Sequence, residues 1–268
     1  MNNNPHLVKP HLPGESFTWE AGSTGILLIH GLKATTAEVR PLAQRLHEHD
    51  YSVSGPLLPG HGTSPKDANR HSWREWLGSV TEHYQTLKSK CEHVFVGGES
   101  TGGLLALHLA SQYTNIEGVL AYSPALELML TWQDRLKLNL FAPFITSVPD
   151  IGDGDRELAW QGYSVNPLRA TQQLLRLQKQ VKRRLPAIHC PLLIVQGRDD
   201  HLVDPSVPES IAAQVSSEIK EIHWMDDSGH CVMLDREKDR VAKITLDFLE
   251  RCLTNGSQPH DELPRENY

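Results

Sequence analysis

The chain has 268 residues, of which 39% are hydrophobic and 22% charged. These fractions are typical of a globular protein, and the length allows one large domain with an insertion. The 26 basic and 33 acidic side chains give a formal net charge of −7, so we expect no nucleic-acid partner. No run of eighteen apolar residues predicts a transmembrane segment, and residues 1–14 do not resemble a secretory signal, so we expect a soluble, cytoplasmic protein.

Cysteines and histidines give no sign of a metal site. The four cysteines lie far apart and lack C-x-x-C spacing, which predicts isolated reduced thiols at Cys91, Cys190, Cys231 and Cys252. The 15 histidines are scattered, and the close pair His47 and His49 does not share a helical face. We therefore expect no metal ion.

Apolar runs alternate with helical patterns in the first half of the chain. Residues 25–30 predict a strand, 36–49 a helix, 51–58 an extended segment and 72–88 a second helix. Further strands are predicted at 116–122, 191–197 and 218–225. This alternation favours an α/β fold whose sheet is mostly parallel and doubly wound.

The segment from Val94 to Leu107 reads as a buried strand, a Gly-x-Ser-x-Gly turn and a helix. Glycines at 98 and 102 leave room for the sharp turn that exposes the hydroxyl of a serine between them. Because both flanking elements are present, the segment predicts a nucleophile elbow with Ser100 as the nucleophile.

The alternation fails between residues 123 and 187, which we predict to be a helical cap inserted into a core of residues 1–122 and 188–253. Such an insertion lands over the carboxyl ends of the strands, where an active site is expected. Apolar side chains fill its first part: Leu126, Met129, Leu130, Trp132, Leu136, Leu138, Leu140 and Phe141. They could dock on a lipid surface, but Asp134, Arg135 and Lys137 interrupt them, which favours core packing.

An elbow serine needs a base, and the base needs an acid that holds its tautomer. His230 follows the predicted strand at 218–225, and either Asp199 or Asp200 follows the strand at 191–197. Negative charge on the reacting oxygen is received by two backbone N–H groups, for which the elbow predicts those of Leu32 and Thr101. His61 and His201 are interpreted as structural.

Several segments together resemble the carboxylesterase and monoacylglycerol lipase branch of the bacterial α/β hydrolases. The matching residues are 28–31, 38–43, 58–65, Trp73 with Trp76, 98–103, 197–200 and 229–230. The resemblance implies the α/β-hydrolase fold and favours Asp200 over Asp199 as the acid. It also implies cofactor-free hydrolysis of carboxylic esters with an aliphatic acyl chain, through an acyl-enzyme at Ser100 and a cap that forms the apolar acyl pocket.

Three features depart from that branch. Thr101 stands where methionine is common, Leu32-Lys33-Ala34 replaces a glycine-containing turn, and Glu99 is unusual beside the nucleophile. A carboxylate at Glu99 close to His230 would raise the affinity of that histidine for a proton.

The triad is equally suited to a lactonase, thioesterase, acyltransferase or carbon–carbon bond hydrolase, and a ligand-binding receptor on a retired hydrolase fold is a further alternative. Residues 254–268 are polar and predict a disordered tail. Pairing of two caps in a homodimer is left open.

Overall fold

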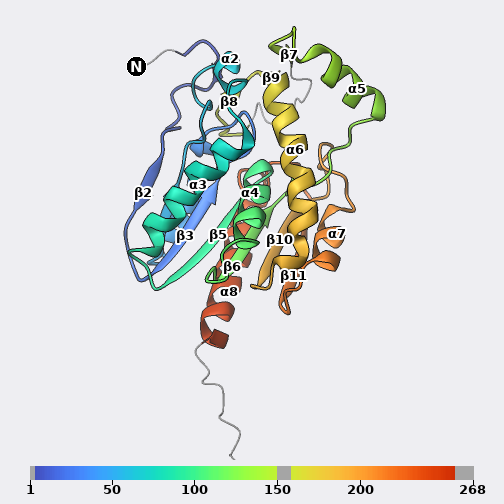
Figure 1. The fold of residues 1–268 in the computed structure, drawn as a ribbon. Helices are drawn as coiled ribbons and strands as arrows, with labels where there is room; N and C mark the ends of the chain where they lie inside the picture. The colour runs from blue at the N-terminus through green and yellow to red at the C-terminus, as the bar shows by residue number, and fades with distance from the viewer. Residues whose placement is uncertain (1–3, 150–157, 257–268) are drawn as a thin grey trace, which may run out of the picture.

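The computed structural model describes residues 4–149 and 158–256, and its centre is one sheet of seven strands (Figure 1). The strand order is β11-β10-β6-β5-β3-β4-β2. The strands are β2 (Phe17–Trp19), β3 (Thr24–Ile29), β4 (Ser52–Gly55), β5 (His93–Glu99), β6 (Gly118–Tyr122), β10 (Leu192–Gly197) and β11 (Lys220–Met225). Only β2 and β4 pair antiparallel within it, so the predicted mostly parallel sheet is confirmed.

Helices cover both faces of the sheet because its strands are apolar on both faces. Leu27 and Ile29 of β3 belong to a cluster with α3 (Trp73–Lys88), α4 (Thr101–Ala110), α6 (Leu168–Arg184) and α7 (Val207–Gln214). Ile26 and Leu28 point the other way and pack with α1 (Arg40–His47) and α8 (Lys238–Gly256). This alternation along one strand is the pattern of a doubly wound sheet.

The helix predicted at 36–49 is divided in the structure. A 3₁₀ turn η1 (Thr36–Glu38) precedes α1, and Pro41 lies in the first turn of α1. A proline suits that position because the first turn of a helix has no internal partner for its N–H groups. The structure also contains β2 and α7, which the sequence pattern did not predict.

The predicted cap, residues 123–187, contains two kinds of element. The helix α6 lies beside α3 and α4, and its Leu174, Leu177 and Val181 belong to the main apolar cluster (Figure 1). The helix α5 (Trp132–Phe141) and the strands β7 (Ser147–Pro149) and β9 (Val165–Pro167) lie beyond the upper end of the sheet (Figure 1). The division of the chain into core and cap stays a prediction.

Core packing of the apolar residues in α5 was a wrong prediction for most of them. Trp132, Leu136 and Leu140 are 71%, 59% and 60% exposed, and Phe144 just beyond the helix is 85% exposed. The positions repeat every four residues and so share one face of the helix. Leu138 points the other way and packs in a small cluster with Ala142 and Leu168.

Short elements complete the chain. They are β1 (Leu7–Val8), which pairs with β8 (Gly162–Tyr163), the helix α2 (Pro65–Ala68) and the 3₁₀ turn η2 (Leu185–Ala187). The last helix continues to Gly256, so the first residues of the predicted tail are helical, and 257–268 lie outside the described residues. Of the helices that the structure describes, none is long and apolar enough to cross a membrane.

Candidate active site

Ser100 stands at a sharp turn between β5 and α4, as the elbow motif predicts. Its backbone is left-handed, with φ +54° and ψ −111°, a conformation that is strained for a residue with a side chain. A Cβ on Gly98 would lie 2.3 Å from the Ile29 carbonyl oxygen, and one on Gly102 would lie 2.0 Å from it. Only glycine fits at either position, so the two glycines allow the turn to pack against the end of β3.

The turn is fixed by backbone contacts from neighbouring strands. The Ser100 amide donates to the Tyr122 carbonyl at 2.8 Å, which ties the elbow to the end of β6. On the other side, a Cβ on Gly31 would lie 3.3 Å from the Ser100 Cβ. The His30-Gly31-Leu32 loop after β3 therefore lies directly against the serine.

Asp200 and His230 are joined by a hydrogen bond. The His230 Nδ1 lies 2.8 Å from the Asp200 Oδ2, and the Asp200 side chain is 1% exposed. The neighbouring Asp199 is exposed instead. Of the two candidate acids, the structure thus brings Asp200 to the imidazole.

The Asp200 carboxylate is held by three further donors. The Gln196 side chain donates to Oδ2 at 2.7 Å, and the Leu202 and Val203 amides donate to Oδ1 at 2.8 and 3.0 Å. Burial alone would raise the pKa of Asp200, but the charge and hydrogen bond of His230 and the bonds from the Val203 and Leu202 amides outweigh it and leave the pKa below its usual value. The group is an anion at neutral pH, which suits it to orient and stabilise a charged imidazole.

The loop that carries His230 is fastened on both sides of the histidine. The Gly229 amide donates to Asp235 at 2.7 Å, and the Met233 amide donates to the Glu99 Oε2 at 3.2 Å. Glu99 is the residue before Ser100. The Met233 contact therefore brings the histidine loop against the end of β5, next to the elbow.

The two predicted oxyanion donors lie in segments that meet at the elbow. Thr101 is fully buried at the first position of α4, and Leu32 follows Gly31 in the loop beside Ser100. The Gly31 amide is already engaged, since it donates to Glu38 at 2.6 Å. This leaves the Leu32 amide as the loop's candidate donor.

A buried carboxylate, Glu99, stands behind the nucleophile. It is fully buried, and its Oε1 has no partner among the residues that the structure describes. Burial raises the pKa of Glu99 well above its usual value, and the charge of Glu38 raises it further against smaller opposing effects of His230 and the Met233 amide. The protonated form is favoured, so the expected charge effect on His230 applies only when Glu99 is ionised.

The two histidines nearest the loop have structural surroundings. His30 engages the Gly31 carbonyl through Nδ1 at 2.8 Å and accepts the Leu58 amide through Nε2 at 3.1 Å. His61 lies edge-on to it, with ring centroids 5.0 Å apart. Burial lowers the pKa of His30 to about 3 and that of His61 to about 4, so both rings are neutral. His201 is exposed.

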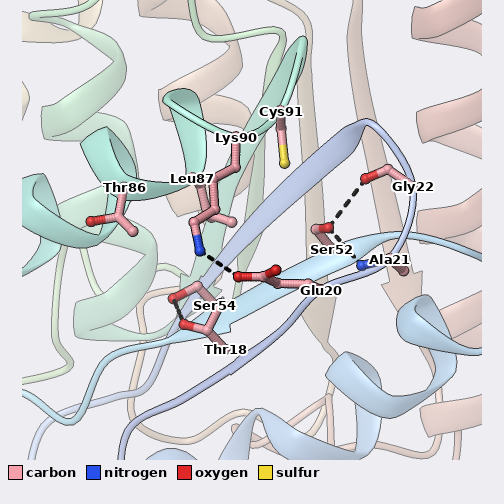
Figure 2. Close-up of a pocket in the computed structure, with 10 residues that line it drawn as sticks. All are labelled: Thr18, Glu20, Ala21, Gly22, Ser52, Ser54, Thr86, Leu87, Lys90 and Cys91. Carbon is pink, nitrogen blue, oxygen red and sulfur yellow. Dashed lines mark hydrogen bonds and ion pairs between the residues drawn. The ribbon is translucent and has the colours of Figure 1, made fainter.

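A separate hollow of about 80 Å³ lies near the amino ends of β3 and β4, whereas Ser100 lies at the carboxyl end of β5 (Figure 2). Its polar groups pair with one another: Glu20 forms an ion pair with Lys90, and the Thr18 and Ser54 hydroxyls lie 3.0 Å apart. Its lining holds no histidine or aspartate. The Ser54 hydroxyl lies 2.9 Å from the His83 Nδ1, but no carboxylate among the described residues is bonded to that ring, so the hollow offers no second catalytic triad. Within residues 4–149 and 158–256, no group of three or more acidic, histidine or cysteine side chains could hold a metal ion.

Sequence reasoning missed Gln196, Glu38 and Asp235, which hold the site together. Gln196 is a buried polar residue at the end of an otherwise apolar strand, and Glu38 is 3% exposed within an apolar helical pattern. The sequence signal that could have found them is a polar side chain at a predicted core position. Such a group is seldom buried without a hydrogen-bond partner.

Comparisons with known proteins show which proteins the whole chain is similar to. Residues 26–244 match the model of the alpha/beta hydrolase family. The chain is 34% identical over 245 residues to a thermostable monoacylglycerol lipase of Bacillus sp. (strain H-257), covering 90% of this chain and 97% of the relative. It is 29% identical over 254 residues to a carboxylesterase of Bacillus subtilis (strain 168), covering 88% and 96%. A solved structure from work on LipS and LipT, two metagenome-derived lipolytic enzymes, matches with a TM-score of 0.84 at 28% identity, covering 90% of this chain and 99% of that one.

Proposed function

The chain belongs to the alpha/beta hydrolase family, in the branch of monoacylglycerol lipases and carboxylesterases, and we propose that it hydrolyses esters of aliphatic acids with Ser100 as its nucleophile. The observation that carries this proposal is the 2.8 Å bond between His230 and Asp200, on a loop that also contacts the residue before Ser100. A carboxylate on Nδ1 leaves Nε2 as the proton acceptor, as a serine base requires.

The reaction proceeds in two balanced halves. The Ser100 Oγ attacks the ester carbonyl carbon while His230 takes its proton, and the Leu32 and Thr101 amides receive the developing oxyanion. When the tetrahedral intermediate collapses, the carbon–oxygen bond to the alcohol breaks and His230 returns the proton to the leaving alcohol. Water, deprotonated by His230, then attacks the acyl-enzyme. The bond from the acyl carbon to the Ser100 Oγ breaks and His230 returns the proton to Oγ, which releases the acid and free Ser100. No step needs a metal or an organic cofactor.

The proposal extends to the kind of ester that is the substrate. The relatives named above are a monoacylglycerol lipase and a carboxylesterase, both of which act on esters. We expect a small-molecule ester with an apolar acyl chain, because the first part of the predicted cap, residues 126–141, is rich in apolar side chains and the cap is expected over the carboxyl ends of the strands. A cytoplasmic location is also part of the proposal, and four free cysteines are compatible with it.

Labelling with a fluorophosphonate tests the nucleophile. We expect covalent modification of Ser100 in the wild-type chain and none in Ser100→Ala, with hydrolysis of p-nitrophenyl esters lost in parallel. Esters of increasing acyl length, a monoacylglycerol and a lactone then define the substrate class. Inactivity on every ester, or labelling that persists in Ser100→Ala, would overturn the proposal.

A matched pair of aspartate variants tests the acid. Asp200→Asn removes the negative partner of His230, and we expect kcat to fall roughly 10³-fold or more, as in other triads. Asp199→Asn makes the same chemical change at an exposed neighbour, and we expect kcat to stay within about twofold of the wild type because surface changes have small effects. Equal losses in both variants would contradict the assignment of Asp200.

A further inference from the structure

Glu38 lies behind the loop that carries the Leu32 amide, and it holds that loop from two sides. Its Oε2 accepts the Gly31 amide at 2.6 Å, and its Oε1 accepts the Trp160 indole N–H at 3.0 Å. The Cys231 thiol, next to His230, lies 3.9 Å from the same Oε1. One carboxylate therefore touches three segments that are far apart in the sequence.

Gly31 is enclosed between this carboxylate and the nucleophile. A Cβ on Gly31 would lie 3.3 Å from both the Glu38 Oε2 and the Ser100 Cβ. The Gly31 amide points to Glu38, and the peptide that follows it carries the Leu32 amide. The direction of the first N–H thus constrains where the second can point, since only two backbone dihedrals separate them.

Trp160 belongs to a segment that pairs with the next part of the loop. The Thr35 amide donates to the Gln161 carbonyl and the Tyr163 amide to the Lys33 carbonyl, each at 3.0 Å. Lys33 itself has a left-handed backbone, with φ +62°, where a glycine would be unstrained. Pairing with the segment from Trp160 to Tyr163 offsets this strain. The same segment also holds Glu38, through the hydrogen bond from the Trp160 indole.

We propose that Glu38 is a positioning residue for ester hydrolysis, whose carboxylate fixes the Gly31 amide and anchors it through Trp160 so that the Leu32 amide faces the oxyanion. The inference rests on the proposed function. Glu38 touches neither the substrate nor the reacting atoms, and it acts through the loop. An oxyanion donor must be in place before the reaction, because its benefit depends on the absence of reorganisation in the transition state.

Glu38→Gln tests this role with little change in size. A glutamine has one acceptor oxygen, so its NH₂ group would face either the Gly31 N–H or the Trp160 N–H, donor against donor. Deleting an oxyanion donor lowers kcat about 10²- to 10³-fold, and for a displaced donor we expect a fall of about 10- to 100-fold. KM for p-nitrophenyl butyrate should change by less than about threefold, because the interaction is made in the transition state.

A boronic acid that forms a tetrahedral adduct with the serine separates positioning from a merely structural role. We expect its inhibition constant to weaken in Glu38→Gln by the same factor as kcat/KM falls. Fluorophosphonate titration counts the competent sites, so that both constants are expressed per active site. A lower melting temperature with unchanged kcat per site and an unchanged inhibition constant would overturn the proposal.

Two further variants complete the design. Glu75→Gln is the matched control, because Glu75 also accepts a backbone amide, that of Ser72 at 2.8 Å, but does so at the start of α3. It should retain wild-type kcat and inhibition constant. Trp160→Phe removes only the indole donor, and we expect kcat to fall about 3- to 10-fold, since small misplacements in an active site are costly.

If Glu38→Gln does not fold, Trp160→Phe decides: a lower kcat with a weaker inhibition constant supports the proposal, and unchanged values overturn it. A wild-type chain that neither cleaves the ester nor labels at Ser100 would overturn the proposed function itself. A fully active wild type with equally active Glu38 and Trp160 variants would overturn only the positioning role.

Discussion

The residue next to the nucleophile is an acid that the fold keeps away from water. Glu99 ends β5 fully buried, and it makes one backbone contact, with Met233, through one of its two oxygens. Burying an ionised carboxylate with so few partners is unfavourable, so the proton stays on the group. Glu99 is thus expected to reduce stability at high pH.

Glu99→Gln should reveal this effect. Because the folded-state pKa of Glu99 lies above its unfolded value, its contribution is fully present below the unfolded pKa and is lost as the pH rises through the folded pKa. Glutamine stays neutral, so the free energy of unfolding of Glu99→Gln, minus that of the wild type, should increase from pH 4.5 to pH 8. The gain is about 1.4 kcal/mol for each pH unit between the two pKa values. Urea unfolding at both pH values measures it, and a difference that does not change with pH would show that the pKa is not raised.

At the scale of elements, α5 and α6 both carry several leucines, but these leucines pack differently. Leu174 of α6 is 3% exposed in the main cluster, whereas Leu136 of α5 is 59% exposed. α6 connects β6 to its parallel neighbour β10, so it must cross a face of the sheet and bury one side. α5 belongs to the same connection in the chain, but it lies beyond the upper end of the sheet and does not cross its face (Figure 1).

Leu174→Ala should therefore destabilise the protein far more than Leu136→Ala. We expect a loss of about 2–5 kcal/mol for the buried leucine, from lost burial and a new cavity. The exposed leucine should change the free energy of unfolding by less than about 0.5 kcal/mol. The midpoints of urea unfolding, compared at equal slope, give both values. Similar losses would mean that α5 is held against the core in solution.

The elements best predicted from the sequence are those whose pattern reports their packing directly. β3 and β10 each contain an unbroken run of four apolar residues, and α3 carries its Trp73, Trp76 and Val80 stripe at helical spacing between a capping box and a lysine. The strand β2 was not predicted, because three residues at an edge bury little and show no periodicity. In α5 the apolar spacing was seen, but spacing alone does not say whether a partner covers that face.

The residues of the candidate site also differ in how far the sequence predicts them. Ser100 and His230 follow from motifs, since the elbow needs glycines at fixed positions and the histidine follows a strand. Choosing Asp200 over Asp199 required a resemblance, and the structure gives the physical reason in the buried bond to His230. Glu38 could not be placed, because its partners Gly31 and Trp160 are brought together only by the tertiary fold.

At the scale of the whole molecule, the buried histidines should limit stability in acid. His30 and His61 are 0% and 1% exposed, and the His30 ring uses one nitrogen toward a carbonyl and the other as an acceptor, which only a neutral ring can do. Their folded-state pKa values of about 3 and 4 lie below the unfolded value of 6.5. The stability that they contribute is therefore present above pH 6.5 and is lost as the pH falls toward those values.

The expected loss is large compared with typical stability. Each histidine costs about 1.4 kcal/mol per pH unit below 6.5, so the two together cost on the order of 4 kcal/mol by pH 5, partly offset by protonation of Glu99. Urea unfolding between pH 7 and pH 5 should show this decline. His61→Gln removes one of the titrating groups and should flatten it by about 1.4 kcal/mol per unit, whereas His201→Gln, at an exposed position, should leave it unchanged. Equal slopes in all three proteins would show that folding does not lower the pKa of His61 and that other groups set the stability in acid.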